Sequence, residues 1–122
     1  ARAYAACCAA AEIVIVEGIG GWRVPLGPVV QTVDLVRELD LPVLLVCGIR
    51  LGCINHALLS AQQILRDGFE LVGWVANSVD PDMLEAEANL STLDDLMPAP
   101  RLSSLPWSPQ AGDAVVGAWR IN

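Results

Sequence analysis

The sequence predicts an α/β fold in which helices flank a parallel sheet. Runs typical of strands cover residues 12–17, 42–48, 70–76 and 101–105, and the first three are strongly apolar. Segments with helical spacing of apolar residues alternate with these runs, a pattern typical of parallel strands joined by right-handed helical crossovers. Hydrophobic residues make up 54% of the 122 residues, and strands covered on both faces account for this high fraction.

The chain begins with an alanine-rich run from Arg2 to Val16. One arginine followed by small apolar residues can resemble a signal peptide, but we favour a helix that leads into the strand at 12–17. That strand ends at Glu17, and a glycine-rich turn over residues 18–21 follows it.

This acid-and-glycine turn is a candidate ligand site. Open α/β sheets bind ligands at the carboxyl ends of their strands. A carboxylate at such an end can hold Mg²⁺, and glycines allow backbone N–H groups to approach a phosphate. A short glycine motif is weak evidence by itself, so a tight turn without a ligand is the alternative.

Three helices are expected after this turn. The first runs from about Gln31 to Leu39, and Pro42 starts the strand after it. The second follows that strand, and its apolar residues fall on one face: Ile54, Ala57, Leu58, Ala61, Ile64 and Leu65. Gly68 is the expected stop of this second helix. The third helix, which is acidic and outward-facing, covers residues 82–97.

Composition narrows the class of protein. The formal net charge is −7 and no basic patch is present, so nucleic acid is not an expected partner. No segment reaches the roughly 18 apolar residues of a membrane span, so no membrane partner is expected.

Residues 107–122 are a poorly patterned tail, and we expect residues 1–122 to form a single domain. The cysteines form neither a CxxC pair nor a zinc spacing, which favours a reducing, cytoplasmic setting: Cys7, Cys8, Cys47 and Cys53.

Four motifs resemble those of one enzyme family. In chain order they are VEGxGGW…PL (16–26), LPV…VxGxxLGCINHA (41–57), GWVAN (73–77) and APxL…xPW (99–107). Together they resemble dethiobiotin synthetase, in the order and with the spacing of that family. LGCINHA and GWVAN in combination are far more specific than any single glycine motif.

The same resemblance reveals two departures. The family carries a phosphate-binding loop of the GxxxxGK[ST] type, followed by a strand with a lysine, whereas this chain has no such loop and no lysine. The resemblance therefore implies an incomplete P-loop NTPase-like fold, that is, the C-terminal portion without its N-terminal half. Ile19 also replaces the small residue usual in its position, and its side chain can crowd the turn.

The resemblance implies a nucleotide site and a metal site. Glu17 would bind Mg²⁺ together with ATP. The residues implied to contact the nucleotide are Glu17, Gly18, Ile19, Gly20, Asn77, Ser78, Pro106, Trp107, Ser108 and Asp113. The amide of Asn77 both donates and accepts, which suits the edge of an adenine, and the alternative is a turn residue that ends a strand.

A substrate site is implied where a helix begins, at Gly52, Cys53, Ile54 and Asn55. Free N–H groups and the helix dipole make such a point a natural anion site. In the family this turn binds the tail carboxylate of the substrate across the dimer interface. The alternative for Asn55 is a helix cap. His56 is expected to be a solvated surface residue, and Arg50 either steers anions or is only a solvated charge.

The implied activity is ATP-dependent closure of a ureido ring. The substrates would be 7,8-diaminononanoate, CO₂ and ATP, with Mg²⁺ as cofactor and a homodimer as the assembly, and this chain alone is expected to be inactive. Two alternatives stay open: a non-catalytic remnant that keeps the dimer-forming and adenine-side surfaces, and another P-loop ATPase or amidoligase of similar fold. GCINH argues against the second, since a partitioning ATPase needs no carboxylate-binding turn.

Overall fold

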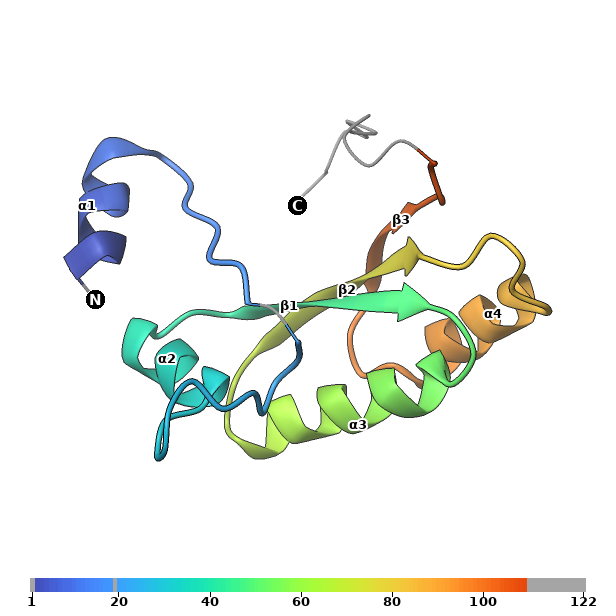
Figure 1. The fold of residues 1–122 in the computed structure, drawn as a ribbon, viewed down its shortest axis with the longest axis horizontal. Helices are drawn as coiled ribbons and strands as arrows, with labels where there is room; N and C mark the ends of the chain where they lie inside the picture. Colours follow the sequence, from blue (N-terminus) through green and yellow to red (C-terminus); the bar gives the residue numbers. More distant parts are fainter. Residues whose placement is uncertain (1, 19, 110–122) are drawn as a thin grey trace. The chain divides into compact units, whose positions relative to one another are not determined.

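The computed structural model describes residues 2–18 and 20–109 (Figure 1). The chain divides into two compact units, Ala1–Leu41 and Pro42–Asn122. Among the residues described, the first unit holds two helices, and the second holds the sheet and two more helices. None of the helices in the described residues is long and apolar enough to cross a membrane.

The first unit contains α1 (Arg2–Ala10) and α2 (Thr32–Leu39). The alanine-rich helix expected at the N-terminus is confirmed, although it ends at Ala10, and none of its residues is buried. The helix α2 is anchored by Thr32, which is buried and whose backbone N–H donates to the carbonyl oxygen of Val24 at 2.9 Å. The carboxylate of Asp34 accepts from the backbone N–H of Gln31 at 2.8 Å, which caps the first turn.

The prediction of a β-strand at residues 12–17 is wrong. Residues 13–18 lie in neither a helix nor a strand, and the side chains of Ile13 and Ile15 are 75% and 88% exposed. A β-strand exists only through backbone hydrogen bonds to a neighbouring strand, and an apolar run does not supply that neighbour. The described sheet therefore has three strands, one fewer than predicted.

The second unit is a parallel sheet with helices, as predicted. Its strands lie in the order β1-β2-β3, and both pairs are parallel. The elements follow one another along the chain as β1 (Val43–Ile49), α3 (Cys53–Arg66), β2 (Leu71–Ser78), α4 (Ala86–Leu96) and β3 (Arg101–Leu105). Figure 1 shows α3 running along the sheet, and α3 contacts β1, β2 and α4.

The core of this unit centres on the middle strand. Trp74 and Val75 are completely buried, and so are Ala61 and Ile64 of α3 and Leu93 of α4. These residues bring the two helices and β2 together, and burial of each large side chain contributes roughly 1.5–3 kcal/mol. The guanidinium of Arg101 stacks over the ring of Trp74, 5.7 Å from its centroid, and closes the core on the β3 side.

The ends of the helices follow from local chemistry. The expected stop at Gly68 is confirmed: its φ is +86°, its N–H donates to Leu65, and the N–H of Phe69 donates to Ile64. This pair of bonds is a Schellman motif. The acidic helix starts at Ala86 instead of residue 82, because the N–H of Asp82 donates to the Asp80 carboxylate at 3.1 Å in a local turn.

Gly73 generates a stability prediction. A Cβ at this position would lie 2.6 Å from Cγ of Leu102 and 3.0 Å from the backbone oxygen of Pro100. Gly73→Ala should therefore lower the free energy of unfolding by about 1–3 kcal/mol, measured by urea denaturation. Gly27→Ala, where a Cβ meets nothing within 4 Å, is the control. Adding Leu102→Ala should remove part of the Gly73→Ala effect, and strictly additive losses would contradict the predicted clash.

Candidate functional site

Three segments meet at one edge of the sheet because its strands are parallel. The register pairs Gly48 with Asn77 and Asn77 with Leu105. The turn after β1, the end of β2 and the segment after β3 thus leave the sheet side by side. Asn77 and Ser78 are half-buried, and the residues just after β3 are exposed, namely Pro106, Trp107 and Ser108. The structure therefore gathers these five predicted nucleotide residues at the ligand-binding edge of an α/β sheet.

The turn at the start of α3 carries unpaired backbone donors. Gly52 is the N-cap, with φ of +87°, a conformation that favours glycine. The N–H of Cys53 donates to the carbonyl of Arg50 at 3.0 Å. Within the described residues, the N–H groups of Ile54 and Asn55 have no acceptor. Two free donors at the positive end of a 14-residue helix can bind a carboxylate or a phosphate oxygen.

Asn55 does not cap this helix. It is the third residue of α3, its side chain is exposed, and the cap position belongs to Gly52. The amide of Asn55 forms no hydrogen bond with any residue that the structure describes. It therefore remains available to a ligand beside the two backbone donors.

Cys53 fixes the turn to the neighbouring helix. Its side chain is 4% exposed, and its Sγ lies 3.9 Å from the side-chain oxygen of Asn89 in α4. This contact holds the first residue of α3 in place, so the turn is part of the packed unit. The burial of this thiol and its contact with Asn89 are typical of a structural cysteine and not of a nucleophile.

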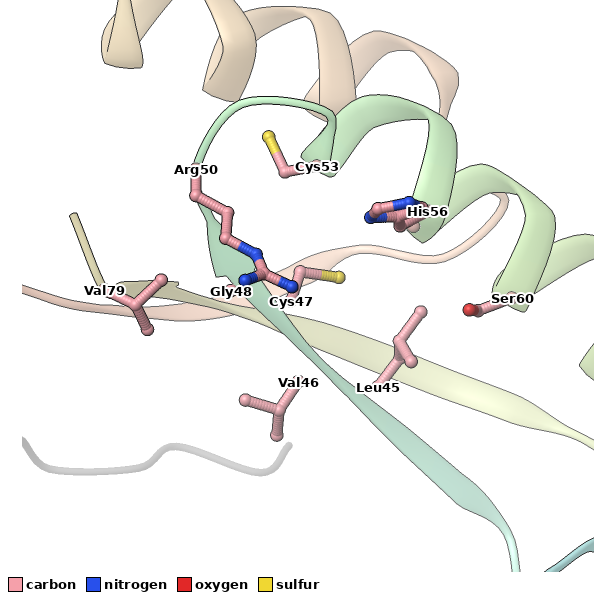
Figure 2. A pocket seen from close by; sticks show the side chains of 10 residues that line it. Leu45, Val46, Cys47, Gly48, Arg50, Cys53, His56, Ser60 and Val79 are labelled. Atoms are coloured by element: carbon pink, nitrogen blue, oxygen red, sulfur yellow. The ribbon is translucent and has the colours of Figure 1, made fainter. Parts of the chain in front are cut away.

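A pocket of about 410 Å³ opens beside this turn, within the second unit (Figure 2). In Figure 2 the guanidinium of Arg50 extends back toward Gly48, and the side chains of His56 and Ser60 lie on the α3 side of the same hollow. The residues that line it are Leu45, Val46, Cys47, Gly48, Arg50, Cys53, His56, Ala57, Ser60 and Val79. Apolar and polar groups both line this hollow, which is open to solvent.

The predicted metal and phosphate residues lie in the first unit. Glu17 is exposed, and its carboxylate forms no hydrogen bond or ion pair with a described residue. Gly20 has φ of +88°, which favours glycine there. Among the described residues no group of three or more metal-binding side chains occurs. A single free carboxylate fits Mg²⁺, which usually takes one or two protein ligands and obtains the others from water and phosphate.

Two predicted residues, Ile19 and Asp113, lie outside the described residues. Conversely, the pocket contains residues that the sequence did not single out as ligands, above all His56 and Ser60. Their spacing of four residues on one helix was the available signal, since i and i+4 share a face. The sequence did not show that this face borders a hollow.

The comparisons define the class of protein. A family model described as an AAA domain matches residues 2–115. The chain belongs to this AAA domain family.

Within that class, the chain is similar to dethiobiotin synthetases. The ATP-dependent dethiobiotin synthetase BioD of Pseudomonas paraeruginosa (strain DSM 24068 / PA7) is 56% identical over 108 residues, 88% of this chain and 47% of that protein. The protein of the same name from Xanthomonas oryzae pv. oryzae (strain PXO99A) is 49% identical over 110 residues, 90% of this chain and 49% of its own length. The resemblance deduced from the motifs is thus confirmed, and the chain spans about half the length of these relatives.

Burial determines how the cysteines react. The surroundings raise the pKa of Cys47 to about 11, mainly because burial disfavours the thiolate and further because Cys53 lies nearby. Since the thiolate is the nucleophile, iodoacetamide at pH 8 should alkylate exposed Cys7 and Cys8 and leave Cys47 unmodified. Labelling of Cys47, followed by mass spectrometry, should rise only as the pH approaches 11. The urea-unfolded chain is the control, and equal labelling of Cys7 and Cys47 in the folded chain would contradict this environment.

Proposed function

We propose that the chain provides the adenine-side and substrate-side surfaces of an ATP-dependent dethiobiotin synthetase. One amine of 7,8-diaminononanoate takes up CO₂ as a carbamate, ATP phosphorylates the carbamate oxygen, and the second amine attacks the carbonyl carbon and expels phosphate. The observation that carries the proposal is the turn 52–55. Its backbone N–H groups at Ile54 and Asn55 are free, and the turn lies within LGCINHA, one of the motifs that resemble the family. The enzyme would be a cytoplasmic homodimer, and residues 1–122 would be part of one α/β domain.

The chain's own groups would bind and orient the reactants. The amide of Asn77 would recognise the adenine edge, since it can donate and accept at once. Trp107, 46% exposed, offers an apolar surface on which an adenine can stack. Glu17 would hold Mg²⁺, which would neutralise charge on the phosphates of ATP. Catalysis of phosphoryl transfer rests mainly on such positioning and charge neutralisation.

The turn 52–55 would bind the tail carboxylate of the diamino acid. The N–H groups of Ile54 and Asn55 would donate to its oxygens, and the side-chain amide of Asn55 would add a further bond. In a homodimer the carboxylate would belong to a substrate whose reacting end lies in the partner subunit. This arrangement would make each site depend on both subunits.

A second candidate is supported by one feature of the sequence. None of the 122 residues is a lysine, and no GxxxxGK[ST] loop is present. A protein with only this sequence would keep the binding surfaces described above without the groups that cradle the β- and γ-phosphates. It would be a non-catalytic remnant that keeps the dimer-forming and adenine-side surfaces. Assays of the chain with and without a phosphate-loop half distinguish the two candidates.

The first activity prediction uses a hybrid in which the N-terminal half of the Pseudomonas paraeruginosa relative precedes residues 2–122. The purified chain alone should form no dethiobiotin from MgATP, CO₂ and the diamino acid, whereas the hybrid should form it. Glu17→Gln in the hybrid should lower kcat by about a hundredfold or more, because a charge-stabilising metal ligand is lost. Product is measured by mass spectrometry. A Glu17→Gln hybrid with unchanged rate and Mg²⁺ dependence would exclude the metal role.

The second activity prediction concerns the carboxylate. Asn55→Ala in the hybrid should raise KM for the diamino acid by about tenfold and leave KM for ATP unchanged, because one hydrogen bond to a charged group is lost. Mixing Asn55→Ala subunits with Glu17→Gln subunits should restore part of the activity, since one of the two sites in each mixed dimer is intact. Equal effects on the KM values for the diamino acid and for ATP would contradict the assignment of Asn55 to the carboxylate. Mixed dimers whose KM for the diamino acid stays about tenfold raised would contradict the cross-subunit arrangement.

A further inference from the structure

The pocket beside the turn has a charge that contrasts with the rest of the chain. The sequence holds 14 acidic residues against seven arginines, yet none of the pocket's lining residues is acidic. One of the seven arginines, Arg50, and the single histidine of the chain, His56, both line it. A hollow with basic and neutral donors and no carboxylate selects an anion.

Arg50 is available to such an anion. In the described part of the chain its guanidinium forms no ion pair or hydrogen bond, whereas Arg37 pairs with Asp34 and Arg101 with Asp94. Figure 2 shows its side chain directed back over the pocket rather than away from the protein. An arginine held near apolar walls without a counter-ion is a strong site for a carboxylate, which its planar guanidinium can bind with two parallel hydrogen bonds.

The remaining residues of the pocket indicate which part of a ligand would lie next to its carboxylate. Leu45, Ala57 and Val79 contribute apolar surface, and the buried thiol of Cys47 stays neutral and adds no charge. His56 and Ser60 can each donate one hydrogen bond toward the hollow. The carboxylate end of an unbranched aliphatic chain matches both the apolar side chains and the single cation, and the rest of the chain can extend out of the hollow toward a partner subunit.

We infer that Arg50 is a specificity-determining residue that holds the carboxylate of an aliphatic acid in this pocket, with His56 as a second donor. The inference rests on the proposed function in that the diamino acid is such an aliphatic acid. The backbone donors of the turn 52–55 are neutral, and Arg50 supplies the full positive charge that they lack. Cys53 belongs to both the turn and the pocket lining, so the two sets of donors adjoin.

Equilibrium dialysis of the 122-residue chain against radiolabelled nonanoate tests the pocket without any catalysis. Nonanoate carries the aliphatic chain and carboxylate and no amine, and nonanamide has the same chain without the charge. We expect nonanoate to bind and Arg50→Gln to weaken its binding by about tenfold or more. Arg50→Lys, which keeps the charge and loses the pair of parallel hydrogen bonds, should weaken binding less than Arg50→Gln does. Arg66→Gln, which removes an exposed arginine from the other end of α3, is the matched control and should bind like the unaltered chain.

The inference fails if Arg50→Gln and Arg66→Gln weaken binding equally, or if nonanamide binds as tightly as nonanoate. In the active hybrid, Arg50→Gln should raise KM for the diamino acid by about tenfold or more and leave KM for ATP unchanged. If the hybrid is active and Arg50→Gln changes neither KM value, the inference is overturned and the proposed function is not affected. An inactive hybrid would overturn the proposed function, whereas the dialysis would still decide the role of Arg50.

Discussion

The site depends on the backbone hydrogen bonds that hold β2 between two parallel neighbours. This register aligns Gly48, Asn77 and Leu105 across the sheet, so that three chain segments emerge at the same edge. The alignment is fixed by burial, since Trp74 and Val75 in the middle strand have no exposed surface. These two neighbours point to opposite faces of the sheet, so a shift of one residue would exchange the side chains packed on the two faces, which makes the register, and hence the site, strongly determined.

The helix α3 converts this sheet edge into a binding surface. Three residues separate it from the end of β1, and its buried face, with Ala57, Ala61 and Ile64, packs toward the sheet. Its axis is therefore set by packing, while its first turn offers donors that the helix itself cannot satisfy. The Schellman motif at Gly68 ends the helix and returns the chain to the start of β2. The helix can be packed firmly and still offer free N–H donors, because its buried face packs on the sheet while the donors lie in its first turn.

Much of this fold could be predicted because its signals are local. The runs that became β1 and β2 are apolar and bounded by turn residues, and α3 has a continuous apolar face. The run at 12–17 carries the same local signal, but a strand also requires a partner that the run itself does not encode. The late start of α4 depends on a side-chain contact of Asp80, which spacing alone does not reveal.

The site could be predicted only in part for a related reason. The motifs identified the turn 52–55 and the end of β2 because each is continuous in sequence. The pocket combines Arg50 in a turn with Ser60, two helical turns further along, and with Val79 after the next strand. Nothing local relates these residues, since their proximity results from the packing of α3 on the sheet. Arg50 could be noted as a charge near the presumed site, whereas its lack of a counter-ion required the structure.

The central claim is that the unpaired donors of the turn 52–55 receive the carboxylate of the diamino acid. Amide hydrogen exchange of the hybrid, followed residue by residue by NMR, tests it most directly, because the N–H groups of Ile54 and Asn55 have no acceptor in the described chain. The account predicts fast exchange at both amides in the free protein and slow exchange once the diamino acid binds, with no change at Gly68. Unchanged exchange at both amides, with binding demonstrated by calorimetry, would contradict it.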